Sequence, residues 1–321
     1  MGRFAVALVV GLLLSWPGAP LRGVSPQPAE SDPQVVTRSQ GTIPVVREHR
    51  YRMAARVRPL LLFWIGKDNV GGARVRWRAG EGSARGFDLL IGSDPARAPR
   101  RINRWGFILE ESRGASSSVL GVMKRSDEDS LDAAKAGTAD EGKQGYFWKM
   151  IRGDSDGAES RATVTLTRAD RDFSYRELDP LLDLLDRSPD PPRVRTTAVP
   201  AGGRAGFLTA VADLVHDAVE SVRRDGRAPG PKSLPYAWYG RHYDLRRVGS
   251  RIVENATYGQ TTYPRLVRTD FEVRARGQSW VESFTLVLAL DGPLAEVPVF
   301  VSYQPKWWFK ADMVLDDRER F

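Results

Sequence analysis

Apolar and polar residues alternate in several segments of this chain, and this period of two constrains the fold more than any other feature. In residues 51–58, Tyr51, Met53, Ala55 and Val57 fall on one face, and arginines fall largely on the other. Such alternation is typical of a β-strand with one buried face. Further strand-like segments cover residues 73–78, 85–92, 104–111, 116–125, 145–152, 161–168, 265–276, 280–290 and 297–304.

The first two of these strands are predicted to form a hairpin. Residues 60–65 are wholly apolar, which indicates a strand covered on both faces. The glycine-rich stretch GKDNVGG at 66–72 is then predicted to be the turn, and Pro59 indicates an edge position or a bulge.

Three segments have helical features. Residues 126–137 start at Ser126 and end at Gly137, and residues 179–187 have Asp179 at the cap followed by proline. In residues 206–225 the apolar side chains recur at helical spacing, and Gly226 suits the C-terminal cap. About ten strands and three helices without regular alternation predict an α+β fold, predominantly antiparallel β.

A proline cluster at 188–193 marks the best domain boundary. We therefore expect two lobes: a β-rich N-terminal lobe over residues 48–187, and an α+β C-terminal lobe over residues 194–321 that opens with the helix at 206–225. Residues 24–47 are rich in proline, serine and glutamine, and they are predicted to be a flexible tether.

Residues 1–23 are predicted to be a signal peptide. Arg3 precedes an apolar run from Phe4 to Leu14, which is shorter than the roughly 20 residues that a membrane-spanning helix needs. The protein is thus expected to be exported, to the periplasm or the extracellular space. No later apolar run has spanning length, so no transmembrane segment is expected in the mature chain.

Charge and cysteine content exclude several classes of function. The net charge is +8, but the arginines are interleaved with acidic residues and do not gather on one stripe or arm, which argues against nucleic-acid binding. The chain has no cysteine, so it has neither disulfides nor thiolate metal ligands. We expect no cofactor.

A G-x-S-x-G motif at 153–157 raises the possibility of a serine nucleophile at Ser155. A nucleophile elbow needs a helix directly after the serine, whereas a strand is predicted here, so the motif is interpreted as a hairpin loop. The alternative is a secreted serine hydrolase in which His242, beside Asp244, is the base.

Metal binding has little support in the sequence. Asp154 and Asp156 resemble the start of a calcium loop, but the later ligands and flanking helices are missing. His49, His216 and His242 do not have the spacing of a zinc pair. We therefore expect no metal site.

Aromatic and arginine clusters are the remaining candidates for ligand binding. Clustered aromatic side chains either fill a core or present a surface for sugars and lipids, and arginine suits phosphate or carboxylate. We predict an exported, non-catalytic protein that binds an envelope lipid or glycan; a structural or assembly protein of the envelope is a further alternative. The candidate ligand-binding residues are Trp238, Tyr239, Tyr243, Trp307, Trp308, Arg100, Arg101 and Arg104.

Overall fold

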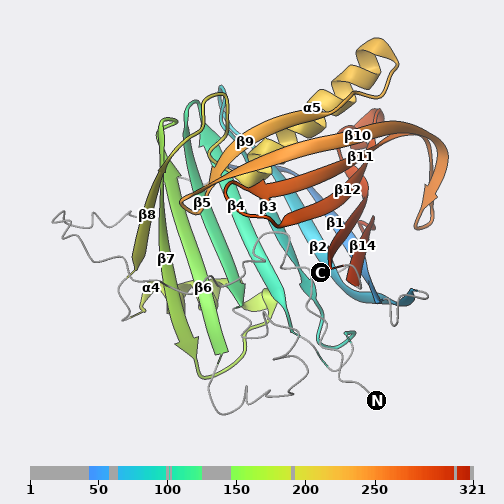
Figure 1. Cartoon of the computed structure of the whole chain (residues 1–321). Coiled ribbons are helices and arrows are strands. Elements are labelled where there is room, and N and C mark those ends of the chain that lie inside the picture. The colour runs from blue at the N-terminus through green and yellow to red at the C-terminus, as the bar shows by residue number, and fades with distance from the viewer. Residues whose placement is uncertain are drawn as a thin grey trace.

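The computed structural model describes residues 43–57, 64–98, 101, 103–124, 146–188, 192–306 and 309–318. These residues form a single antiparallel sheet of 14 strands and two α-helices (Figure 1). The helices are α4 (Leu178–Asp186) and α5 (Phe207–Asp225). The strands are β1 (Val45–Val57), β2 (Ile65–Ala79), β3 (Arg85–Ser93), β4 (Trp105–Arg113), β5 (Ser116–Lys124), β6 (Tyr146–Ser155), β7 (Glu159–Ala169), β8 (Arg193–Ala198), β9 (Lys232–Trp238), β10 (Arg241–Tyr258), β11 (Thr261–Ala275), β12 (Val281–Ala289), β13 (Pro298–Lys306) and β14 (Phe309–Leu315).

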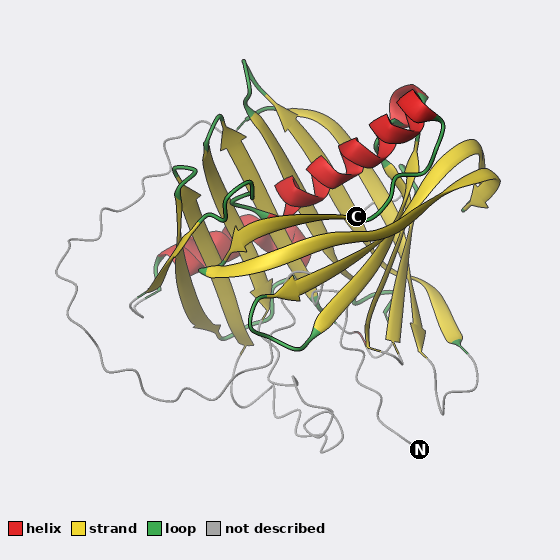
Figure 2. Cartoon of the chain, turned by 45° about the horizontal axis from the view of Figure 1, so that its top comes forward, coloured by secondary structure: helices red, strands yellow, loops and turns green. Residues whose placement is uncertain are grey.

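The sheet is a meander in which neighbouring strands follow one another along the chain, apart from the pairing of β1 with β14. Its two edge strands are β8 and β9, and α5 lies between them in the sequence. The sheet curves strongly, so that these edges approach each other (Figure 2). His242 of β10 lies 3.1 Å from the Thr197 hydroxyl and 2.7 Å from the Ala198 carbonyl oxygen of β8. The sheet therefore nearly closes on itself.

Helix α5 lies on the inner, concave side of the curved sheet (Figures 1 and 2). It contacts β3, β9, β10 and β11. Its apolar face, which includes Phe207, Leu214, Val215 and Val222, is buried in a core shared with residues of β9 to β13. Burial of this amphipathic face, more than helix propensity, holds the helix in place.

The opposite face of β4 to β7 carries a separate core. Trp105 and Trp148 pack at 5.1 Å between ring centroids, and Leu181 and Leu185 of α4 belong to the same cluster. Because successive residues of a strand point to opposite faces, β4 directs Trp105 to this core and Ile108 to the core under α5.

The structure confirms a predominantly antiparallel β fold and the predicted helices at 179–187 and 206–225. It shows two α-helices among the described residues instead of three, because the helix predicted at 126–137 lies outside them. It does not show two lobes. The segments assigned to separate lobes share one sheet through the β1–β14 pairing.

One local prediction was wrong. Residues 66–72 are not a turn, since β2 runs through them opposite β1 and β3, with a bulge near Met53 and a positive φ of 56° at Asn69. Residues 193–198, placed at the boundary of the C-terminal lobe, form the edge strand β8. Ile43 in the predicted tether is buried, and its N–H donates to Glu111. Residues 1–42, with the predicted signal peptide, lie outside the described residues.

None of the helices in the described part of the chain combines the length and the apolar composition needed to cross a membrane.

A candidate ligand cavity under helix α5

A cavity of about 380 Å³ lies between α5 and the concave face of the sheet. Its walls come from β1, β2, β3 and from β12 to β14, so both halves of the chain contribute. The alternation seen in the sequence explains why these residues meet, because Tyr51, Ala73, Val75 and Met313 are inward positions of paired strands. The β1–β14 pairing that joins the two halves of the sheet thus also builds this cavity.

The deep part of the cavity is apolar. Tyr51, Ile91 and Met313 have exposures of 1 %, 2 % and 3 %. From the opposite side, α5 contributes Leu208, Val211, Ala212 and Val215. The other apolar lining residues are Ala73, Val75, Trp77, Phe87, Leu89, Phe207, Phe284, Leu286, Pro298 and Val301.

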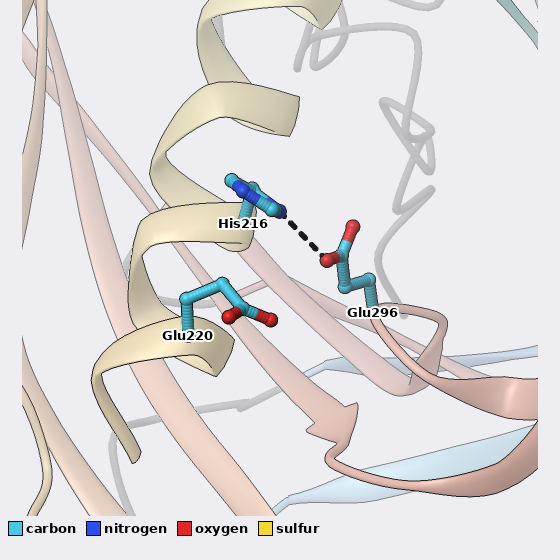
Figure 3. Close-up of side chains that lie close together, drawn as sticks. All are labelled: His216, Glu220 and Glu296. Carbon is cyan, nitrogen blue, oxygen red and sulfur yellow. Dashed lines mark hydrogen bonds and ion pairs between the residues drawn. The ribbon is translucent and has the colours of Figure 1, made fainter. Parts of the chain in front are cut away.

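The charged lining residues are Arg85, His216 and Glu296, and they mark the rim of the cavity. Their side chains are 44 %, 63 % and 31 % exposed, in contrast to the buried floor. His216 Nδ1 lies 2.8 Å from a Glu296 carboxylate oxygen (Figure 3). This contact links α5 to the loop between β12 and β13 across the opening.

The loop that carries Glu296 is held by further contacts. Glu296 has a positive φ of 64°, and its N–H donates to the Ala289 carbonyl oxygen. Arg47 donates to the Ala295 carbonyl oxygen at 3.3 Å, and its guanidinium lies 4.5 Å from the centre of the Trp77 ring. Burial lowers the pKa of Arg47, and the charge of Glu296 opposes this effect.

On the other part of the rim, Asp213 of α5 accepts hydrogen bonds from two arginines. Arg85 donates to one carboxylate oxygen at 3.0 Å, and Arg204 donates to the other. Two guanidinium groups thus face one carboxylate, which leaves one positive charge in excess at this point.

The position of α5 depends on Glu110, which β4 directs to the N-terminus of the helix. This buried carboxylate accepts from the N–H groups of Phe207, Leu208 and Thr209 at 2.7, 3.0 and 2.9 Å, and from the Thr209 hydroxyl at 3.1 Å. Burial raises the pKa of Glu110, and these hydrogen bonds oppose the effect. A negative charge also interacts favourably with a helix N-terminus. Glu110 therefore fixes α5, the roof of the cavity, to the sheet.

One group of described residues at the rim is close enough together to hold a metal ion. It consists of His216, Glu220 and Glu296, whose possible ligand atoms all lie within 4.8 Å of one another (Figure 3). Each side chain already has a protein partner: His216 contacts Glu296, and Glu220 accepts from Arg223 at 2.7 Å. Asp154 and Asp156, the metal candidates from the sequence, do not belong to this group.

The G-x-S-x-G motif forms the tight turn between β6 and β7, which confirms the hairpin loop predicted from the sequence. Ser155 donates to the Glu159 carbonyl oxygen at 2.6 Å and accepts from the Gly157 N–H. His242 bonds to β8, and Asp244 pairs with Arg276 at 2.8 Å. In the part of the chain that the structure describes, Ser155, His242 and Asp244 therefore form no hydrogen-bonded triad.

The aromatic candidates are not gathered on one exposed surface. Trp238 and Tyr243 are buried in the core under α5, at 6 % and 2 % exposure. Tyr239 has a positive φ of 54° and lies between the cations of Lys149 and Arg195. Trp307 and Trp308 lie outside the described residues.

The arginine candidates lie apart from the cavity lining. Arg101 is exposed with a positive φ of 54°, Arg104 is half-buried, and Arg100 lies outside the described residues. In the preceding turn, Arg97 pairs with Asp94 at 2.9 Å, so this loop pairs an arginine with an acidic residue of its own.

Sequence reasoning missed the cavity itself. The apolar faces of β1, β2 and α5 were visible in the sequence, but their meeting depends on strand pairings that join distant residues. Glu110 and Glu296 had no local sequence feature that could have assigned them to a site.

No family model, curated protein or solved structure matches this chain. Its function therefore has to be argued from the site.

Proposed function

We propose that this protein binds an amphipathic, lipid-type molecule in the cavity under α5. The observation that carries the proposal is the division of the cavity into an apolar floor and a charged rim. An acyl chain or another apolar group would occupy the floor, and the polar end of the molecule would lie at the rim.

The size and lining of the cavity support this ligand class. Ligand cavities of proteins measure roughly 300–1,000 Å³ and have mainly apolar walls with few polar groups. The volume of about 380 Å³ falls within this range. Transfer of an apolar chain from water to such a site is favourable, at about 0.8 kcal/mol for each buried CH₂ group.

One end of the rim suits a negatively charged group of the ligand. Arg85 lines the cavity there and shares Asp213 with Arg204, so positive charge exceeds negative charge at that end, whereas Glu296 places a negative charge at the other end. Arginine presents several N–H donors in a plane, which suits a carboxylate or phosphate.

Of the two ligand classes expected from the sequence, the structure gives more support to lipid than to glycan. Sugar binding by stacking needs accessible aromatic faces, but Trp238 and Tyr243 are buried. If the chain is exported, as residues 1–23 predict, the lipids of the cell envelope are the ligands that it would meet.

Saturated fatty acids of increasing length test the proposal by calorimetry or by displacement of a fluorescent fatty acid. Affinity is expected to rise about fourfold with each added CH₂ group, as 0.8 kcal/mol implies, until the cavity is filled, and then to level off. An affinity that does not depend on chain length would contradict burial of the chain.

A pair of variants locates the binding. Ala212→Phe places a ring in the cavity from α5 and is expected to weaken fatty-acid binding at least tenfold. Ala158→Phe adds the same ring at an exposed position in the β6–β7 turn, and it should bind like the unmodified protein. Equal affinities of the two variants would place the ligand elsewhere.

A further inference from the structure

A row of arginines lies on the face of β1 and β2 that points away from the cavity. Tyr51 of β1 and Ala73, Val75 and Trp77 of β2 point into the cavity, so the residues between them point to the outer face. These outer positions carry what we term the arginine surface: Arg50, Arg52, Arg74, Arg76 and Arg78.

The strand register brings like charges together on this surface. Arg50 lies directly opposite Arg74 in the antiparallel pairing of β1 with β2. Like charges in this position destabilise a sheet. Glu48 lies opposite Arg76 and accepts from both Arg76, at 2.6 Å, and Arg50, at 2.7 Å. One carboxylate is thus shared between two of the arginines.

Arg74 has no acidic partner among the described residues. Its Nε atom is buried and makes no hydrogen bond, and the residue as a whole is half-buried. Burial lowers the pKa of Arg74, and repulsion from Arg76 and Arg50 lowers it further, while the charges of Asp88 and Glu48 oppose this effect. A cation in this setting lacks the acceptors that compensate for loss of hydration.

The other arginines of this surface have acidic partners. Arg78 pairs with Asp88 at 2.9 Å, and Arg52 has a longer contact of 3.6 Å with Asp316. Among the five described arginines of the surface, Arg74 is therefore the one that forms no ion pair.

We propose that the arginine surface binds phosphate groups, at a site centred on Arg50 and Arg74. A phosphate between these two side chains would relieve their repulsion and would supply the acceptor that Arg74 lacks. Arginine is well suited to this role because its planar fork donates two parallel hydrogen bonds to phosphate oxygens. The site is on the opposite face of the sheet from the cavity and does not depend on the function proposed for the cavity.

Two binding measurements on the purified full chain test the site and identify the source of the phosphate. Calorimetry with inorganic pyrophosphate probes free phosphate, and co-sedimentation with phosphatidylglycerol vesicles, against phosphatidylcholine vesicles, probes lipid phosphate. Arg74→Gln is expected to weaken binding about fivefold, and the double variant Arg50→Gln/Arg74→Gln about 25-fold, at low salt. Arg227→Gln is the matched control, since it removes the same charge from an exposed position after α5.

Thermal unfolding separates binding from a purely structural role. Because Arg74 faces Arg50 and has no partner, Arg74→Gln should unfold at the same temperature as the unmodified protein or at a higher one, while its binding falls. Weakened binding of pyrophosphate alone would assign the site to soluble phosphates, and weakened binding of vesicles alone would assign it to lipid. If Arg74→Gln and Arg227→Gln bind alike in both assays, or if the unmodified chain binds neither probe, the proposal is wrong.

Discussion

Replacement of Glu110 by glutamine tests how α5 is held against the sheet. In the structure, one carboxylate oxygen accepts from Phe207 and Leu208, and the other accepts twice from Thr209. Glutamine keeps one oxygen but places an NH₂ group where the second oxygen was. Two hydrogen bonds to a charged group are therefore lost, at about 1.5 kcal/mol each, or about 3 kcal/mol together.

Thermal unfolding followed by circular dichroism measures this loss. In a chain of this size, each kcal/mol lost from the free energy of unfolding lowers the unfolding temperature by about 2–4 °C, so Glu110→Gln should lower it by about 6–12 °C. Glu111→Gln is the matched control, because Glu111 lies on the other face of β4 and accepts from the Ile43 N–H at 2.8 Å. Glutamine keeps the one oxygen that accepts this bond, so Glu111→Gln should change the free energy of unfolding by less than about 1 kcal/mol. If Glu110→Gln unfolds no lower than Glu111→Gln, the hydrogen bonds of Glu110 do not hold α5 against the sheet.

Three further predictions concern the turn at Ser155 and the rim of the cavity. Ser155→Ala removes two turn hydrogen bonds and should cost about 1–2 kcal/mol in thermal unfolding, yet leave any esterase activity unchanged; lost activity with an intact fold would support the hydrolase alternative. Hydrogen bonds from the Glu159 and Ala158 N–H groups lower the pKa of Asp156 in the folded protein. The ionised Asp156 therefore stabilises the fold above about pH 4, and this stabilisation is lost as the pH falls through the lowered pKa. Asp156→Ala should therefore lower the unfolding temperature at neutral pH but not at about pH 2, and an equal loss at both would contradict this. His216→Ala breaks an exposed contact with Glu296 and should change the free energy of unfolding by less than about 1 kcal/mol in denaturant titrations. The same variant should release bound fatty acid faster. A larger change in the free energy of unfolding would show that the contact supports the fold.

The local elements could be predicted where burial follows a simple period. Strands such as β7 and β11 alternate between two environments, and α5 has one apolar face and a glycine cap at Gly226, where φ is 68°. In these segments the sequence pattern and the tertiary packing favour the same structure.

Predictions failed where distant residues decide the structure. Residues 66–72 resemble a turn, but Gly71 lies so close to β3 that a Cβ atom there would be 2.1 Å from the Gly92 carbonyl oxygen. The glycine therefore serves close strand packing. Strand β8 has no buried residue, and its half-buried positions are Arg195 and Thr197 while Val194 is exposed, so it has no apolar alternation to detect.

The cavity depends on the same long-range information. Its floor needs the pairing of β1 with β14, which are separated by most of the chain, and its roof needs Glu110 of β4 at the start of α5. The sequence could suggest an apolar ligand, but it could not place one.

Photo-crosslinking with a diazirine-labelled fatty acid, followed by peptide mapping, tests whether the ligand lies in the cavity under α5. We expect the label to attach to residues 208–215 of α5 and to residues 73–77 of β2, and we expect an excess of unlabelled fatty acid to prevent this. Attachment to the outer face of the sheet or to the N-terminal residues alone, or no attachment that unlabelled fatty acid prevents, would contradict it.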